Sequence, residues 1–246
     1  MPSRPDPVPG TSASGPTVGI IGTGRLAAAL RQRCQDEELP IRQYATRSRH
    51  GWVDVPAPDV LVDCSAPAVT HHVLDLCQSL RVPLVMCVSN VDPKHLVRMA
   101  ELARDTAVVH ATNLSLGSYL QSRVVDHIAT LVRGLGPPEA AVLERHPSTK
   151  AHRPSATASA LAELWRQCTG AAPSDVASLR AGPPVSDHEI RLSWAAQAVV
   201  IRHEVYSLDA AASGAVAAAR WVIGRGSGRY SEHDVFDDLV TGKAWP

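Results

Sequence analysis

A run of side chains suited to proton transfer and anion binding stands at residues 145–158, with the sequence RHPSTKAHRPSATA. An imidazole can donate a proton near neutral pH, and an ammonium group neutralises an anion. The run directly precedes a helical pattern. Ser155 is therefore placed to cap a helix whose first amides lack internal partners and can bind an anion. The stretch predicts a joint site for an anion and a proton transfer, with capping alone as the alternative role of Ser155.

A second candidate site is the glycine turn in GIIGTGRLA, residues 19–27. Gly22 and Gly24 stand between a strand pattern and a helical pattern, where glycine permits a tight turn and a close approach of the backbone to a pyrophosphate. The turn predicts dinucleotide binding, and a Rossmann-type domain that has lost its nucleotide is the alternative. The candidate cofactor-binding residues here are Gly22, Thr23, Gly24, Arg25 and Leu26.

Arginines near this turn favour NADPH over NADH. The second strand pattern runs into YATRSRH, without the acidic residue that would bind the ribose hydroxyls of NADH. This stretch offers Arg47 and Arg49 instead, and Arg25 stands just inside the glycine turn. A guanidinium pairs well with a 2′-phosphate, so we expect NADPH, with NADH as the alternative. An ordinary solvated position explains Arg49 better.

The elements that must position these groups alternate between strand and helix up to about residue 113. Strand patterns at 18–21, 41–46, 59–65, 82–89 and 107–113 alternate with helical patterns at 25–34, 68–80 and 93–105. Because several of these strands are apolar throughout and the joints are short, they predict a doubly wound parallel sheet that is buried on both faces.

Beyond residue 113 the pattern changes. Helical patterns at 115–136 and 156–168 are interspersed with strand patterns at 139–146, 174–181, 188–195 and 198–206, and an Ala-rich helix (210–223) and a short tail close the chain. The last two strands alternate in polarity, which predicts an antiparallel sheet with one wet face. The predicted fold class is α/β, a Rossmann-type doubly wound parallel sheet, plus an α+β domain with a mixed or antiparallel sheet.

These patterns divide the chain into three parts. Residues 1–16 are rich in Pro, Ser and Gly without an apolar signal core, which predicts a disordered extension. Residues 17–113 are the predicted dinucleotide-binding domain, completed by about residues 222–246. Residues 114–221 are the predicted substrate-binding and oligomerisation domain.

Composition excludes several functions. Lys+Arg and Asp+Glu balance at 24 each, so no net field draws the chain to nucleic acid or anionic lipid. No run reaches the length of a membrane-spanning helix. The five cysteines lack CxxC pairing, which is typical of reduced thiols in a cytoplasmic protein.

No metal is expected from the spacing of the histidines. Adjacent residues on a helix point in different directions, which separates the pair at 71–72. Strand neighbours face opposite sides, which separates the His-Glu pairs at 188–189 and 203–204. No set of His, Cys and acidic residues has the spacing of metal ligands.

Four separated patches resemble the dihydrodipicolinate reductase family, whose members reduce a cyclic imine-type dicarboxylate with NAD(P)H. The patches are VDCSAP (62–67), ATNLSLG (111–117), ERHPSTKAHRPSATA (144–158) and HEVYSLDAAASGAVAAARWVIGRGSGRYSEHDVF (203–236). They stand in the family's order and spacing. The resemblance implies the same fold and a tetramer joined through the sheet of the second domain.

The resemblance also implies roles for individual residues. His146 matches the family's proposed proton donor, and Lys150 matches the lysine that assists substrate binding and protonation. Ser155 and Thr157 match groups that hold a substrate carboxylate together with adjacent amides. The candidates are His146 and Lys150 for catalysis; Asn113, Ser155, Ala156 and Thr157 for substrate binding; and Arg47, Ser65 and Ser89 for cofactor binding beyond the glycine turn.

Other positions depart from the family pattern near the expected substrate. Pro147 replaces a second histidine, Leu208 stands where an arginine is usual, and residues 87–90 differ from the family's G-T-T-G. His146 and Lys150 are nevertheless retained. This combination predicts a proton-transfer and anion site that acts on an altered substrate.

Together these features predict an NAD(P)H-dependent reductase of a C=N or conjugated bond in a small carboxylated cyclic substrate, in a specialised biosynthetic pathway. One alternative is a non-redox dehydratase, cyclase or isomerase, supported by the altered residues 87–90. The other is a non-catalytic homologue, against which the retained His146 and Lys150 argue. The expected partners are the small-molecule substrate and copies of the chain in a homotetramer, with no nucleic acid and no membrane.

Overall fold

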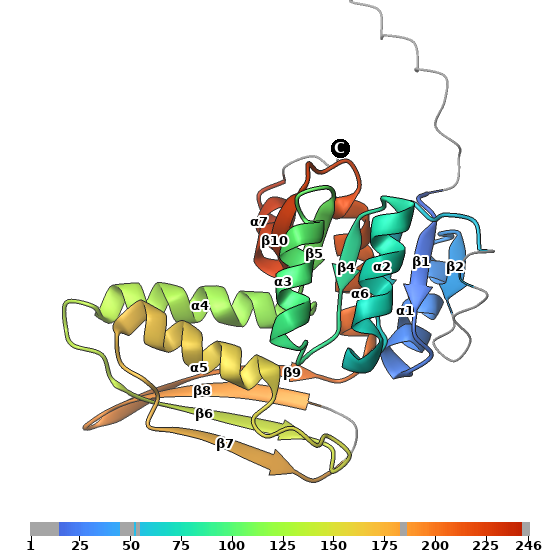
Figure 1. The fold of residues 1–246 in the computed structure, drawn as a ribbon. Helices are drawn as coiled ribbons and strands as arrows, with labels where there is room; N and C mark the ends of the chain where they lie inside the picture. Colours follow the sequence, from blue (N-terminus) through green and yellow to red (C-terminus); the bar gives the residue numbers. More distant parts are fainter. Residues whose placement is uncertain (1–14, 45–51, 53–54, 183–185, 243–246) are drawn as a thin grey trace, which may run out of the picture.

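A computed structural model describes residues 15–44, 52, 55–182 and 186–242 of the chain. Figure 1 shows two halves, each built on its own sheet, joined side by side. The first fourteen residues of the predicted disordered extension lie outside the described residues, as does the candidate Arg47. No helix within the described ranges is long and apolar enough to cross a membrane.

The first half is a sheet of six parallel strands in the order β10-β5-β4-β3-β1-β2. The strands are β1 (Val18–Ile21), β2 (Ile41–Tyr44), β3 (Val60–Asp63), β4 (Leu84–Met86), β5 (Ala107–His110) and β10 (Gly228–Ser231). Strands β1, β3 and β4 are buried at every residue, because helices cover both faces of the sheet.

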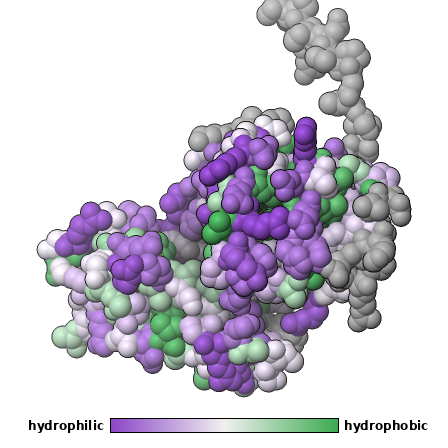
Figure 2. Space-filling model, viewed as in Figure 1, coloured by the Kyte–Doolittle hydropathy of each residue, from purple (hydrophilic) through white to green (hydrophobic). Residues whose placement is uncertain are grey.

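Two layers of helices enclose this sheet. Helices α1 (Arg25–Asp36) and α6 (Asp209–Val222) pack on one face, together with part of α7 (Glu232–Val240). Helices α2 (Thr70–Leu80), which follows the short 3-10 turn η2 (Pro67–Val69), and α3 (Pro93–Leu102) pack on the other face. Figure 2 shows mainly hydrophilic side chains on the outer surface over α2 and α3, as expected of helices with one buried face.

The second half is a mixed sheet of four strands in the order β7-β6-β8-β9. Its strands are β6 (Glu139–His146), β7 (Asp175–Arg180), β8 (Ser186–Trp194) and β9 (Gln197–Val205). Strands β6 and β7 are parallel, and the other pairs are antiparallel. Helices α4 (Leu116–Val132) and α5 (Ala156–Thr169) cover one face and enclose a core around Trp165 and Ile190 (Figure 1).

The predicted fold class is confirmed, but three details differ from the prediction. The segment expected to be a short tail forms β10 and α7, and β10 completes the parallel sheet beside β5. Helix α6, expected within the second domain, packs instead on the first sheet beside α1. Strand β9 is exposed at residues 197–200 rather than on one face alone, because it is an edge strand.

Candidate active site

The turn after β1 requires glycine at its first position. Gly22 has a φ of +119°, and a Cβ there would lie 2.7 Å from the carbonyl oxygen of Cys64. The side-chain amide of Gln43 braces the turn by donating to the carbonyl oxygens of Ile20 and Gly22. Gly24 begins α1 without a side-chain cap, and a Cβ there would meet nothing within 4 Å. The first amides of α1 therefore stay uncovered.

This turn fits the diphosphate of a dinucleotide. Thr23, Gly24 and Arg25 are exposed, and the first turn of α1 contains no acidic residue that would repel an anion. Ser65 follows β3 and Ser89 follows β4, so both lie at the same carboxyl edge of the parallel sheet as the turn. Open parallel sheets bind their ligands at this edge.

A buried carboxylate organises the second half. Glu144 on β6 is fully buried, and its Oε1 accepts hydrogen bonds from Ser178 Oγ at 2.6 Å and Arg180 Nη2 at 2.7 Å. The backbone amide of Ser155 donates to both carboxylate oxygens at 3.1 Å. Burial by itself would raise the pKa of Glu144, but these hydrogen bonds outweigh it and bring the pKa down to about 2. Glu144 is therefore ionised at neutral pH.

Two imidazoles face the other oxygen of this carboxylate. Glu144 Oε2 lies 3.3 Å from His146 Nε2 and 3.8 Å from His188 Nε2, and the two Nε2 atoms are 3.2 Å apart. His188 is opposite Glu144 across the β6–β8 pair, and His146 lies two residues further on the same face of β6. We call these three residues the Glu-His-His cluster.

Burial sets the charge of both histidines. Burial, reinforced by His146, lowers the pKa of His188 to about 3, so its ring is neutral in the working pH range. Burial also lowers the pKa of His146 below its ordinary value, although the nearby Glu144 carboxylate opposes this shift. His146 is therefore the member of the pair that changes protonation more readily.

Arg180 ties the loop that carries Lys150 to the Glu-His-His cluster. Besides its bond to Glu144, the Arg180 guanidinium donates from Nε to the carbonyl oxygen of Lys150 at 3.0 Å and from Nη2 to that of His152 at 2.5 Å. The Arg180 side chain is almost completely buried. The Lys150 ammonium forms no ion pair with any described residue, so its charge is available to a ligand.

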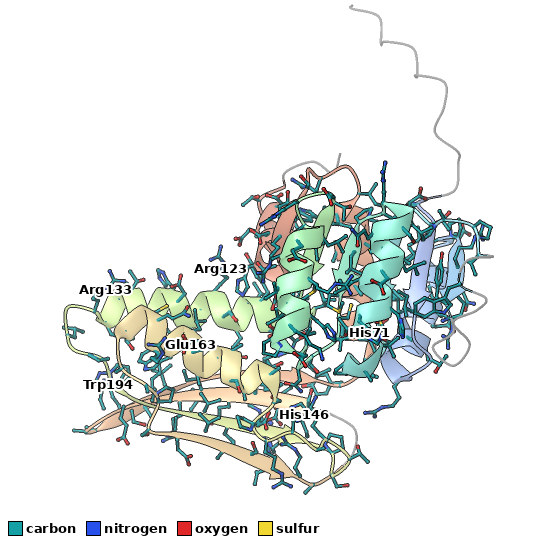
Figure 3. The ribbon with its side chains drawn as sticks, viewed as in Figure 1. His71, Arg123, Arg133, His146, Glu163 and Trp194 are labelled. Atoms are coloured by element: carbon teal, nitrogen blue, oxygen red, sulfur yellow. The ribbon has the colours of Figure 1, made fainter. Side chains whose placement is uncertain are left out.

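His146 and Lys150 share a cavity with the first half of the molecule. The cavity has a volume of about 250 Å³ and receives Arg25 from the start of α1. Figure 3 shows His146 at the end of the second half that lies nearest the first, whereas Arg133 and Trp194 mark its far end. The residues that line the cavity are Arg25, His146, Pro147, Thr149, Lys150, Ser186, Val205, Ser207 and Leu208.

The candidates at the start of α5 lie beside this cavity rather than on its wall. Ser155 is buried, and its Oγ accepts from the Ala158 amide at 3.2 Å and contacts His188 Nε2 at 3.2 Å, so it does cap its helix. Asn113 Nδ2 donates to Thr157 Oγ1 at 3.3 Å, and both line a separate cavity of about 80 Å³. His146 and Lys150 therefore line the larger cavity and Asn113 and Thr157 the smaller one, whereas Ser155 contacts the Glu-His-His cluster through His188.

Glu144 and His188 are site residues that the sequence reasoning did not identify. Residues 188 and 189 do face opposite sides of the sheet, as predicted, but the partners of His188 come from the neighbouring strand. Glu144, His146 and His188 are the three ligand-type side chains whose donor atoms converge, within 4.8 Å, among the residues the structure describes. The sequence offered one indication of Glu144. Strand alternation puts it on the same face of β6 as Ala140 and Val142, which are buried.

Comparison with known proteins places the chain in a family. The family model for the N-terminus of dihydrodipicolinate reductase matches residues 33–114, and the model for its C-terminus matches residues 117–236. The 4-hydroxy-tetrahydrodipicolinate reductase of Xanthomonas euvesicatoria pv. vesicatoria is 33% identical over 180 residues, which cover 73% of this chain and 74% of the relative. The chain belongs to the dihydrodipicolinate reductase family.

Two further similarities are consistent with this family. The 4-hydroxy-tetrahydrodipicolinate reductase of Haloarcula marismortui is 27% identical and covers 87% of this chain and 96% of its own. A dipicolinate-bound dihydrodipicolinate reductase from Paenisporosarcina sp. TG-14 superposes with a TM-score of 0.68 at 16% identity, covering 88% of this chain and 97% of that one. A likeness at this identity shows the shared fold of the family.

Proposed function

We propose that this dihydrodipicolinate reductase family member is an NAD(P)H-dependent reductase of a C=N or conjugated bond in a small carboxylated cyclic compound. One observation carries the proposal: a single cavity is lined by His146 and Lys150 from the second half and by Arg25 from the nucleotide turn. A proton donor, a cation and the start of α1 thus meet where the two halves adjoin.

The cofactor in this proposal is NADPH, with NADH as the alternative. When bound, it supplies the hydride for the reduction. The amides of residues 23–26 hold its diphosphate, because Thr23, Gly24 and Arg25 are exposed and α1 begins without a side-chain cap. The buried Gly22 shapes the turn before them, and its own amide donates to the carbonyl oxygen of Tyr44 at 3.4 Å. Ser65 and Ser89 contact it from the ends of β3 and β4. Arg25 contributes a guanidinium that suits a phosphate, which favours NADPH.

The chain's own residues bind the substrate and move a proton. His146 donates the proton that completes the reduction, and Lys150 neutralises negative charge on the substrate. The amides of Ala156 and Thr157, at the start of α5, hold a substrate carboxylate, since helix start amides have no partners within the helix. Asn113 aligns Thr157 through the hydrogen bond between their side chains.

The lining of the cavity supports a substrate different from that of the named relatives. Pro147 and Leu208 lie on the same cavity wall as His146 and Lys150. Proline and leucine side chains supply apolar surface and no hydrogen-bond donor. We therefore place the chain in a specialised biosynthetic pathway, acting on a compound related to 4-hydroxy-tetrahydrodipicolinate.

A homotetramer joined through the second sheet completes the proposal. Helices α4 and α5 cover one face of that sheet, and no helix of the described chain covers the other face (Figure 1). Leu179 on β7 and Val200 on β9 are about half exposed on the uncovered side. Exposed apolar side chains on a sheet are suited to packing against another copy.

A nucleotide titration tests the proposed function. Purified protein is titrated with NADPH and with NADH while the fluorescence of the nucleotide is followed, and we expect saturable binding with NADPH the tighter. No binding of either nucleotide at millimolar concentration would remove the reductase proposal. A second measurement adds 4-hydroxy-tetrahydrodipicolinate and follows NADPH absorbance. Tight binding without oxidation of NADPH would point to another substrate or to a non-redox reaction.

A further inference from the structure

The two ring nitrogens of His146 lie in different surroundings. Nε2 faces the buried interior, 3.2 Å from His188 Nε2 and 3.3 Å from Glu144 Oε2. Nδ1 makes no hydrogen bond to any described residue. The His146 side chain is 13% exposed and lines the cavity shared with Lys150 and Arg25. One nitrogen is therefore engaged by the protein, and the other is free for a ligand.

The neighbours of Nε2 determine where its proton lies. An ionised carboxylate only accepts hydrogen bonds, so Glu144 favours a proton on the nitrogen nearest to it. That nitrogen is Nε2 of His146, which is closer to Glu144 Oε2 than Nε2 of His188 is. With this proton in place, His146 Nε2–H lies between Glu144 Oε2 at 3.3 Å and His188 Nε2 at 3.2 Å, and the buried His188 ring stays neutral.

We propose that Glu144 and His188 hold His146 through Nε2, so that His146 delivers the reacting proton from Nδ1. Glu144 and His188 are then positioning residues, since they act through His146 and do not line the cavity. The inference rests on the proposed function, because it specifies how the proton donor of that reaction is arranged. The arrangement resembles in its logic the buried carboxylate that orients a catalytic imidazole and stabilises its charged form.

The proton transfer balances without any further reagent. His146 begins as an imidazolium with protons on both nitrogens. The Nδ1–H bond breaks, a new bond to hydrogen forms on the substrate, and the electron pair of the broken bond stays on Nδ1. The neutral ring keeps its Nε2 proton beside Glu144, which remains a carboxylate throughout. A proton from solvent recharges the ring.

Charged groups from several elements surround His146. Glu144 on β6 favours the charged ring, whereas Lys150 and Arg180 disfavour it, and Arg25 of α1 lines the same cavity. Glu144 is the only anion in this set. Removal of its charge leaves three cations around the ring. The protonated form of His146 is then disfavoured, so the pKa of His146 should fall.

Nuclear magnetic resonance of the 15N-histidine-labelled protein tests the tautomer directly. The full-length protein is examined without nucleotide, and the His146 signals are assigned by their loss in His146→Gln. We expect neutral His146 to carry its proton on Nε2. A proton on Nδ1 in the neutral ring would overturn the proposal. This measurement requires no turnover, so it decides the inference even if the protein does not oxidise NADPH and the proposed function fails.

A pH profile tests the positioning role of Glu144. In Glu144→Gln, the limb of kcat/KM that falls with rising pH should move to lower pH by about one unit, which lowers the rate above that limb about tenfold. NADPH affinity should stay unchanged. The matched control is Glu189→Gln, because Glu189 is on β8 directly after His188 but faces the opposite side of the sheet. An unshifted limb in Glu144→Gln would overturn the role of Glu144.

His188→Asn supplies a second test should Glu144→Gln not fold. This variant removes the partner of His146 Nε2 and retains the Glu144 charge. We expect the single tautomer of His146 to give way to a mixture of both and kcat to fall, with the KM for NADPH unchanged. A single Nε2–H tautomer with the wild-type rate would overturn the role of His188.

Discussion

At the scale of single residues, the charge of Glu144 explains most of the site's chemistry. A buried carboxylate is costly unless hydrogen bonds compensate it. Ser155, Ser178 and Arg180 provide this compensation, mainly at Oε1, and leave Oε2 facing the two histidines. The same carboxylate thus anchors the start of α5 through Ser155 and, through Arg180, the loop of Lys150.

Replacement of His146 should separate chemistry from nucleotide binding. In His146→Gln we expect kcat to fall by about 10² to 10⁴, the usual contribution of a general acid, because glutamine cannot donate a proton of comparable acidity. The dissociation constant for NADPH should not change. The control is His127→Gln, since His127 is an exposed residue of α4. Unchanged turnover in His146→Gln would show that the proton comes from elsewhere.

Acidification should destabilise the second half through His188. Its pKa is lowered to about 3 in the folded protein from an ordinary value of 6.5. The unfolded chain therefore binds the proton first. The contribution of the neutral His188 ring to the free energy of unfolding is fully present above pH 6.5. It is lost as the pH falls from 6.5 towards 3. Each pH unit in this window costs about 1.4 kcal/mol from this residue.

Urea unfolding at pH 7 and pH 5 measures this effect. The free energy of unfolding should fall between the two values in the wild type and should fall less in His188→Asn, which has no imidazole to titrate at this position. His127→Gln should behave like the wild type. An equal pH slope in the wild type and His188→Asn would contradict the prediction.

At the scale of elements, backbone conformation and strand register place the reactive groups. Gly22 lets β1 pass into α1 within a short turn, so α1 starts at the carboxyl edge of the sheet. In the second sheet, the pairing of β8 with β6 puts His188 opposite Glu144. A register shift of one residue would turn His188 to the opposite face and dissolve the Glu-His-His cluster.

Substitution of the two turn glycines should have unequal effects. Gly22→Ala forces an alanine to a φ of +119° and places its Cβ against the backbone of Cys64, so we expect a loss of about 1 to 3 kcal/mol of stability. Gly24 has a φ of −76° and open space at its Cβ position, so Gly24→Ala should unfold near the wild-type temperature. Thermal unfolding measures both variants, and equal midpoints would refute this account of the turn.

At the scale of the whole molecule, the return of the chain to the first half joins the two sheets. After β9 the chain enters α6, which packs with α1 on the first sheet, and β10 then adds the sixth strand. Glu232, at the start of α7, accepts hydrogen bonds from the amides of Thr112 and Asn113 where the chain first leaves that sheet. These bonds hold the exit of the chain after β5 to the start of α7.

Assembly through the uncovered sheet face gives a prediction at this scale. We expect light scattering to give four times the chain mass of 26.2 kDa. Val200→Glu should lower this mass while the far-UV circular dichroism stays unchanged, because Val200 faces away from the side of β9 that carries the partly buried Ile201 and the buried His203. Val124→Glu on α4 is the control, since both valines are 45% exposed. A tetramer that survives Val200→Glu would place the interface elsewhere.

Much of the architecture was predictable because local patterns specify local structure. Apolar runs such as those of β1 and β3 predicted a parallel sheet, and the Ser155 cap and the Gly22 turn were recognisable from their neighbours in the chain. Strand β10 was missed because GRYS has no apolar run and becomes a strand only by pairing with β5. The predicted domain boundaries and site roles stay predictions, although α6 lies on the first sheet.

The sequence by itself determined which elements form and which residue types stand at the glycine turn and at the start of α5. Periodicity, capping and backbone freedom act over a few residues, so they can be read from the order of the residues. Only the tertiary structure decided that His188 meets Glu144 and His146, and that Arg25 shares their cavity. Contacts of this kind depend on strand register and on the packing of distant segments, which no local pattern specifies.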